Sequence, residues 1–425
     1  MASTPTKPTP QSSTRTPVGT RHVASASGGL SANIDYPFLV LYLAAISAFG
    51  SFVNDMYLPS LPSMCRYFNC SVPMVQLGLT TGMIGLGVGE VMLGPLSDKY
   101  GRKPVLVWSM VLFCLAAVAS VFSPSIHIFL MWRFVQGIGA SGAYFLARTI
   151  PADIYGGRTL AKTMAVVGAI NGFAPAAAPV LGGIVADHYD WKGVFVCLTI
   201  FAVLLLLFSR RLKETLPETL RQRGSIWRSF ASYRKLLANK RFMAHTLLKA
   251  AALGLLFAYI SSAPFIMQTH FGYTQTQFGL FMGGNALFVG LGSMVALRFR
   301  ILKRAAFVGS LGLAVTIAAL CCVLFLVDNF WAYELLLLPL TFCLGMIFTV
   351  TNTLAMNEGR ADAGAASAVI GIAGYIFGAI VSPLVGQGNI MHSTAIVFAV
   401  LTAIILAGAF MTRAIPADLD NPPHQ

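Results

Sequence analysis

The sequence predicts an all-α membrane protein with twelve transmembrane helices arranged in two six-helix halves. Of its 425 residues, 56% are hydrophobic and only 10% are charged, whereas a soluble domain carries about 25% charged residues. The apolar stretches are long enough to cross a bilayer core of about 30 Å, which takes roughly 20 residues per helix. They fall into two groups of six on either side of a basic segment. Helices are expected because lipid offers the backbone no hydrogen bonds.

The elements follow in a simple order along the chain. Residues 1–35 form a Ser-, Thr- and Pro-rich tail that we expect to be disordered, without the apolar core of a signal peptide. Residues 36–209 form the first half, 210–240 a basic loop, 241–413 the second half, and 414–425 a C-terminal tail. Spans are expected at 36–58, 73–97, 103–122, 125–151, 160–187, 191–209, 241–269, 274–298, 304–326, 330–356, 364–388 and 392–413.

The net charge of +14 would suit a nucleic-acid-binding protein, but its distribution argues against that class. Nearly all Lys and Arg residues between the spans lie on alternate loops, and the other side receives only Arg66 and Lys192. Basic loops stay on the cytoplasmic side. We therefore expect both termini and the middle loop in the cytoplasm, with no nucleic-acid partner.

A weak internal repeat accompanies this layout. Gln76–Leu79 resembles Gln277–Leu280 at an offset of 201 residues, and the same offset sets Lys303 and Arg304 opposite Arg102 and Lys103. Secondary transporters are commonly built from such repeats. The sequence therefore favours a transporter.

The seven cysteines show no metal-ligand spacing, so no metal site is expected. Cys65 and Cys70 fall in a loop placed outside, where a disulfide can persist. A local disulfide and two unpaired thiols both remain open.

The turn Gly94–Pro104 reads GPLSDKYGRKP, with glycines that permit a tight turn and charges at the membrane surface. It resembles the signature turn of the major facilitator superfamily. The resemblance implies a cytoplasmic latch made by Asp98, Arg102, Lys103 and Asp153, which holds the outward-open state and releases the cytoplasmic side when it breaks. The alternative for Asp153 is an ordinary helix-end charge.

The fourth span contains Arg133-Phe-Val-Gln136-Gly-Ile-Gly. An arginine inside a membrane is costly and usually marks a functional cavity. Gln136 lies three residues on, on the same helix face. The stretch resembles a superfamily motif that is tied to proton coupling. The alternative is an arginine that snorkels to the surface.

The fifth span is rich in Gly, Ala and Pro. Its prolines are expected to kink the helix, and its small residues allow close helix contact. It resembles the antiporter motif of drug:proton exchangers and so favours export over import. The alternative is a kinked packing helix. The motif positions are Gly172, Pro175, Pro179, Gly182 and Gly183.

Two further stretches, Asn54–Pro62 and Phe257–Phe265, resemble segments of the bicyclomycin/chloramphenicol-resistance (Bcr/CflA) subfamily of drug:proton antiporters. The resemblance covers nearly everything from about residue 36 to 413. It implies a monomeric exporter of small, largely apolar drugs in the bacterial inner membrane. Protons would be the coupling ion, and no other cofactor is expected.

Asp55 is the leading candidate for the proton carrier, because a low-dielectric cavity favours the protonated form of a carboxyl group. At 1.5 Å per residue, Asp55 and Arg133 both fall in the outer half of the membrane, where they could share a cavity. The alternative for Asp55 is a cap at the helix end. Some relatives carry a second acid two turns earlier, where this chain has Ser47, so two carboxylates in this span are not expected.

Glu90 and Lys249 lie at a similar depth, about 12 Å into the membrane from the same side. Two buried charges of opposite sign suggest an ion pair between spans 2 and 7. Such a pair would either respond to protonation or simply neutralise both groups.

Polar, aromatic and soft side chains typically line promiscuous apolar pockets. For each candidate of this kind, ordinary helix packing is an equal alternative. The expected cavity residues are Asn54, Met56, Gln136, Tyr259, Phe281, Asn285, Asn352 and Met356.

The sequence also bears on three other classes of protein. A proton-coupled transporter of a metabolite, such as an amino acid or nucleobase, shares most of these features. A channel or receptor needs neither an intramembrane Asp and Arg at matched depth nor two halves. A membrane enzyme is not expected, because the sequence lacks a nucleophile–base set, a metal cluster and a phosphate loop.

Overall fold

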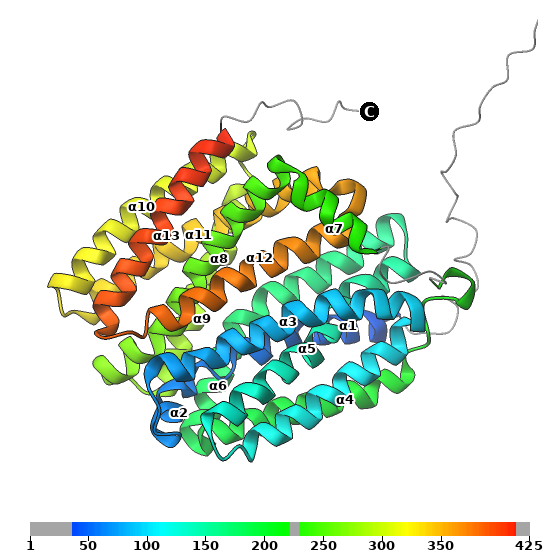
Figure 1. The fold of residues 1–425 in the computed structure, drawn as a ribbon, viewed down its shortest axis with the longest axis horizontal. Helices are drawn as coiled ribbons and strands as arrows, with labels where there is room; N and C mark the ends of the chain where they lie inside the picture. The colour runs from blue at the N-terminus through cyan, green and yellow to red at the C-terminus, as the bar shows by residue number, and fades with distance from the viewer. Residues whose placement is uncertain (1–35, 222–228, 414–425) are drawn as a thin grey trace, which may run out of the picture. The chain divides into compact units, whose positions relative to one another are not determined.

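The computed structural model describes residues 36–221 and 229–413, and its regular elements there are all helical (Figure 1). The first half contains α1 (Tyr36–Asp55), the short α2 (Leu61–Tyr67), α3 (Val72–Tyr100), α4 (Arg102–Val121), α5 (Ile126–Ile154) and α6 (Gly157–Phe208). The second half contains α8 (Lys240–Pro264), α9 (Gln275–Ala296), α10 (Leu302–Leu326), α11 (Phe330–Glu358), α12 (Ala363–Leu384) and α13 (Ile390–Arg413). The predicted tails lie outside the described residues.

Twelve crossings can be counted in these ranges, as predicted. Ten helices are long and apolar enough to cross a membrane. One of them, α6, is two crossings, because Asp190 has a φ of 58° and breaks the helix. The remaining crossing is α5, whose 29 residues include Arg133 and Arg148, polar residues that lower its mean hydropathy.

Local sequence explains where several helices begin and end. Pro59 and Pro62, which occupy first-turn positions, follow the end of α1 and open two short helical segments. Gly101 has a φ of 102° and allows the sharp turn from α3 to α4. Thr274 and Gln277 form a reciprocal capping box at the start of α9.

The helices pack closely within each half, and two pairs of helices join the halves. α3 packs along α12, and α6 packs along α9. In Figure 1, α12 and α3 run side by side through the bundle. We call the end of the bundle where Asp190 divides α6 the Asp190 end, and the opposite end the Asp98 end.

Polar bonds link the two halves at the Asp190 end. Asp187, after the first crossing of α6, accepts hydrogen bonds from the backbone N–H groups of Gln275 and Thr276 at 3.2 and 2.9 Å. The Thr276 hydroxyl also donates to Asp187 at 2.5 Å. Two further bonds run from Gln76 Nε2 to the Ser261 carbonyl and from Gln268 Nε2 to the Pro59 carbonyl, both 2.9 Å. This end is therefore closed in the present conformation.

The middle segment differs in part from the predicted loop. α7 (Ser229–Ala238) forms within it and packs on α8 and α12, with Leu236 buried against Phe242 and Ala366. The high charge of residues 210–240 hid this helix, because only a few of its apolar residues face the bundle.

Candidate transport site

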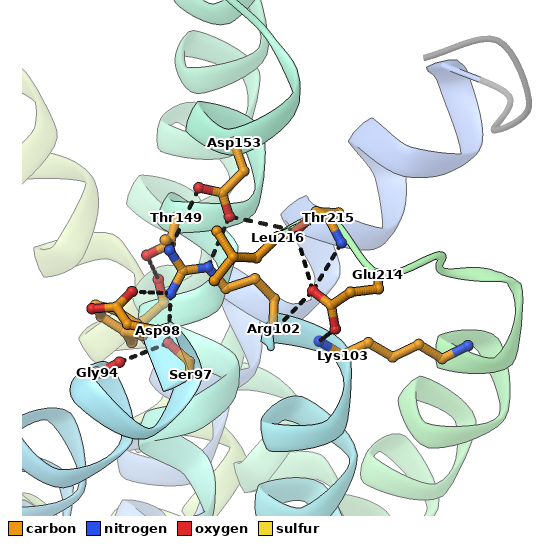
Figure 2. A network of polar contacts seen from close by, with 11 residues as sticks. Gly94, Ser97, Asp98, Arg102, Lys103, Thr149, Asp153, Glu214, Thr215 and Leu216 are labelled. Carbon is orange, nitrogen blue, oxygen red and sulfur yellow. Dashed lines mark hydrogen bonds and ion pairs between the residues drawn. The ribbon is translucent and has the colours of Figure 1, made fainter. Parts of the chain in front are cut away.

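Arg102 is the centre of a polar network at the Asp98 end (Figure 2). Its guanidinium donates to Asp98 at 2.6 Å and Ser97 at 2.7 Å through Nη1, and to Asp153 at 2.8 Å through Nε. The planar fork suits this arrangement because it serves several acceptors at fixed angles. The arginine side chain is only 7% exposed. The structure thus confirms the predicted contacts between Asp98, Arg102 and Asp153.

Glu214 completes this network and was missed by sequence reasoning. Its carboxylate accepts from the backbone N–H groups of Arg102 at 2.9 Å and Lys103 at 3.2 Å. It therefore caps the start of α4, where a negative charge also suits the helix dipole. Lys103 joins through its side chain, which donates to the Arg210 carbonyl. All these partners belong to residues 94–216, so the bonds tie the first half to its own loop.

Arg133 is completely buried between α1, α3 and α5. Nη1 donates to Gln136 Oε1 at 2.9 Å, and both Nη atoms approach the Val53 carbonyl at 3.4 Å. The guanidinium also lies 4.2 Å from the centroid of the Tyr57 ring, a cation–π contact. The snorkelling alternative is therefore wrong, because this side chain points into the bundle.

Glycines make the space that Arg133 occupies. A Cβ at Gly82 would lie 3.0 Å from Nη2 of the arginine, and a Cβ at Gly137 would collide with the Gly82 carbonyl oxygen. Gly139 similarly allows α4 to approach, since a Cβ there would lie 2.7 Å from the Phe113 nitrogen. The glycines of the motif thus hold α3, α4 and α5 close around a buried charge.

Asp55 ends α1 beside this arginine. Tyr57 is within electrostatic reach of both Asp55 and Arg133. Within the described residues, however, no ion pair joins Asp55 to Arg133, and no hydrogen bond reaches the Asp55 carboxyl. Arg133 therefore has its charge balanced by carbonyl oxygens and a ring, and the Asp55 carboxyl is left available to another ligand or proton.

The glycines and prolines of the fifth span lie against α9 and the segment after α1, at one end of the span only. A Cβ at Gly182 would collide with the Met56 carbonyl, and one at Gly183 with the Gln275 carbonyl. In return, Gly279 of α9 lies against the Pro179 carbonyl. Nearer the Asp98 end the close contact is missing, because a Cβ at Gly172 would meet nothing within 4 Å. The predicted close helix contact is thus confirmed for Gly182 and Gly183 and absent for Gly172.

The second half contains a buried polar cluster formed by Tyr259, Asn285 and Glu334. Asn285 Nδ2 donates to Tyr259 Oη and to Glu334 Oε1, each at 2.9 Å. Tyr259 and Asn285 were predicted cavity residues, and the structure brings them together. Glu334 was missed, because a single acid one turn into a predicted span looks like a helix-end residue.

The predicted contact between Glu90 and Lys249 is wrong in this conformation. Lys249 Nζ donates to Asn352 Oδ1 at 2.7 Å, and no ion pair among the described residues joins it to Glu90. The electrostatic partner of Glu90 is Arg148 of α5, whose guanidinium also lies 4.0 Å from the centroid of the Tyr144 ring. The prediction compared depth but not direction around the helix, and it left out Arg148 as a competing cation.

Other predicted cavity residues are dispersed. Phe281 belongs to an aromatic cluster with Tyr273 and Phe330, at ring-centroid distances of 5.5 and 4.9 Å. Met356 packs near α7 in the apolar cluster around Leu236. For these two, helix packing was the correct alternative. Asn54 is partly exposed, Met56 is buried and its backbone lies against Gly182, Gln136 accepts from Arg133, and Asn352 holds Lys249.

Cys65 of α2 and Cys70 of the loop after it are free thiols. Cys65 Sγ donates to the Cys70 carbonyl at 2.8 Å. Of the two alternatives, unpaired thiols describe this structure.

Comparison with known proteins places the chain in a family. The Major Facilitator Superfamily profile matches residues 43–383. An uncharacterized MFS-type transporter of Bacillus subtilis, YdgK, is 34% identical over 380 residues, which cover 84% of this chain and 93% of that protein. The chain therefore belongs to the major facilitator superfamily, a family of membrane transporters.

Further relatives define the neighbourhood within the superfamily. A chloramphenicol resistance protein of Pseudomonas aeruginosa is 31% identical over 251 residues, 58% of each chain. A bicyclomycin resistance protein homolog of Haemophilus influenzae is 24% identical over 384 residues, 87% of this chain and 94% of that protein. These relatives confirm the predicted resemblance to the bicyclomycin/chloramphenicol-resistance subfamily.

Solved structures agree on the fold. A D-xylose–proton symporter superposes with a TM-score of 0.70 at 18% identity, covering 91% of this chain and all of that one. A bacterial homolog of the lysosomal transporter Spinster gives a TM-score of 0.70 at 15% identity, covering 89% and 97%. The twelve-helix major facilitator fold is thus confirmed for this multi-pass membrane protein.

Proposed function

We propose that this transporter is a proton-coupled antiporter that exports small, largely apolar drugs across a bacterial inner membrane, with both termini in the cytoplasm. The observation that supports this proposal most strongly is the Asp55 carboxyl, which has no hydrogen-bond partner among the described residues and lies beside the fully buried Arg133. The relatives named for resistance to chloramphenicol and bicyclomycin support the drug class. The close glycine contacts of the fifth span support antiport.

The proposed coupling follows from the charges around α1. Arg133 is fixed by the Val53 carbonyl, Gln136 and the Tyr57 ring, so its guanidinium is held against α1 two residues before Asp55. A nearby cation favours the ionised carboxylate, whereas burial favours the neutral acid. These opposing effects would let Asp55 bind a proton in one conformation and release it in another. A drug in the same cavity would compete with that proton.

Alternating access would then move the two halves around this site. With the Asp98 end in the cytoplasm, the hydrogen bonds at the Asp190 end close the outer side, and the conformation is inward-facing. The Arg102 network is intact here and lies within the first half. In our proposal it therefore acts as a latch indirectly, by holding the α3–α4 turn in the shape that meets the second half when the cytoplasmic side closes.

Transport by Asp55→Asn tests the proposal. Cells that express the wild type should survive chloramphenicol or bicyclomycin better than cells without it, and Asp55→Asn should remove this protection because the amide binds no proton. Asp55→Glu should keep part of it. Glu218→Gln is the matched control, because that side chain is 86% exposed in the loop. Equal protection by Asp55→Asn, at equal amounts in the membrane, would contradict the role of Asp55.

A further inference from the structure

Glu334 is a second buried carboxyl group within the membrane, and the coupling scheme above does not use it. It belongs to α11 and is 6% exposed. Within the described residues it accepts one hydrogen bond, from Asn285 Nδ2 to Oε1 at 2.9 Å. Its Oε2 is buried without a partner within the described residues. An acid in such a place is either neutral or very costly, since a buried ionised carboxylate needs paired charges or several donors.

The surroundings of Glu334 contain no such charges. Two ionisable side chains face it, Tyr259 of α8 and Tyr333 of its own helix. α9 has no ionisable side chain at all, and among the described residues no Lys, Arg or His forms an ion pair with Glu334. The basic residues of α8 and α10, His245 included, lie in the first two turns of these helices, at the Asp98 end, except for Lys249, which is held by Asn352. Cys321 of α10 interacts electrostatically with Cys322, and Tyr375 of α12 with Glu90, Tyr144 and Arg148, rather than with Glu334.

The unpaired polar atoms around Glu334 favour the protonated, neutral form of its carboxyl group. Asn285 Oδ1 and the Tyr333 hydroxyl are buried and also lack partners. An ionised Glu334 adds only acceptors and must draw its donors from the tyrosine hydroxyls, whereas a protonated Oε2 supplies a donor of its own to an unpaired acceptor. Asn285 also ties Glu334 to Tyr259, a residue of the predicted cavity.

The internal repeat places Glu334 at the position equivalent to Arg133. The offset of 201 residues that aligns Gln76–Leu79 with Gln277–Leu280 carries Arg133 onto Glu334. Both are buried polar residues that face inward, on α5 and α11 respectively. The first half thus has a fixed cation beside an acid, and the equivalent place in the second half has an acid beside an amide and two phenols.

From this arrangement we propose that Glu334 is a second proton-binding site of the transporter, protonated in the present conformation and deprotonated once per cycle. This proposal rests on the proposed proton-coupled function. The step is the uptake and release of one proton at the carboxylate, with no other bond formed or broken. The consequence is that each cycle moves one proton more than Asp55 alone provides.

Infrared difference spectroscopy tests the protonation directly and without transport. The purified, substrate-free protein is taken from high to low pH, and the C=O band of protonated carboxyl groups is recorded. We expect Glu334→Gln to remove one component of that band, whereas the exposed Glu218→Gln leaves the buried component unchanged. A buried component that is the same in wild type and Glu334→Gln would overturn the proposal. Should Glu334→Gln not reach the membrane, Asn285→Ala replaces it, because loss of the Asn285 bond must shift the band if Glu334 produces it.

Stoichiometry separates this inference from the proposed function. In vesicles, the membrane voltage that stops chloramphenicol exchange gives the number of protons per drug molecule. We expect this number to be one lower in Glu334→Gln than in the wild type. If Asp55→Asn stops coupled transport while Glu334→Gln keeps the wild-type ratio, the second site fails and the proposed function stands. If Asp55→Asn couples normally, the proposed role of Asp55 fails, and the infrared result alone decides whether Glu334 binds a proton.

Discussion

Replacing Gly183 by alanine should open the Asp190 end of the transporter. The added Cβ would collide with the Gln275 carbonyl oxygen of α9, a backbone atom that cannot turn away. Overpacking of this kind costs about 1–3 kcal/mol. The cost arises only while α6 and α9 touch at this end, so it destabilises the present conformation relative to one in which they separate. The equilibrium should shift by about 5- to 150-fold.

Gly172 offers a matched control within the same helix and the same motif. A Cβ there would meet nothing within 4 Å, so Gly172→Ala adds no collision. Alanine also favours a helix by about 1 kcal/mol over glycine, but this gain is present in both conformations and at both positions. Any difference between the two variants therefore reports the contact with α9.

Distances between spin labels measure the shift. His127 of the first half and Gln387 of the second are both exposed at the Asp190 end and carry the labels. Gly183→Ala should raise the population with a long distance between these positions, and Gly172→Ala should match the parent protein. The reasoning is refuted if Gly183→Ala keeps the parent distribution or if both variants shift equally.

Three further predictions follow from the contacts. Arg102→Lys keeps the charge but loses the planar fork that joins Asp98 to Asp153, at a cost of about 1.5–3 kcal/mol per charged hydrogen bond. The melting temperature in detergent and the transport rate should therefore both fall. Unchanged values would argue against a stabilising role of the network. Asp187→Ala removes three hydrogen bonds from the start of α9. It should raise the rate at which buried positions at the Asp190 end are chemically labelled. An unchanged labelling rate would show that these hydrogen bonds do not close that end. Burial raises the pKa of Cys70 to about 11, and the thiolate is the reactive form. Maleimide labelling of Cys70 should therefore keep rising about tenfold per pH unit above pH 8.5, where an ordinary thiol levels off. A plateau near pH 8.5 would contradict the raised pKa of this half-buried thiol.

Contacts between residues close in sequence, or between motifs with fixed roles, could be predicted from the sequence. Asp98 and Arg102 are four residues apart across one turn, and Arg133 and Gln136 three apart on one helix face, so spacing alone brought them together. The apolar spans gave the fold for the same reason, because length and hydropathy are local properties.

Contacts that depend on direction around a helix could not be predicted. Sequence position estimates the depth of Glu90 and Lys249, but depth does not say which way a side chain points, and Lys249 reaches Asn352 instead. Glu214 caps α4 from a loop more than a hundred residues further along the chain, which no local pattern indicates. Glu334 carries no motif, and only the packing of α11 against α8 and α9 shows that it faces inward.

Drug-driven proton movement through the purified transporter tests the central claim most directly. Vesicles containing the protein and an internal pH indicator receive an outward or inward gradient of chloramphenicol, with no other ion gradient. We predict a proton flux opposite to the drug in the wild type, none in Asp55→Asn, and a normal flux in Glu218→Gln. Drug movement without any proton flux in the wild type, or an undiminished flux in Asp55→Asn, would contradict proton-coupled antiport through Asp55.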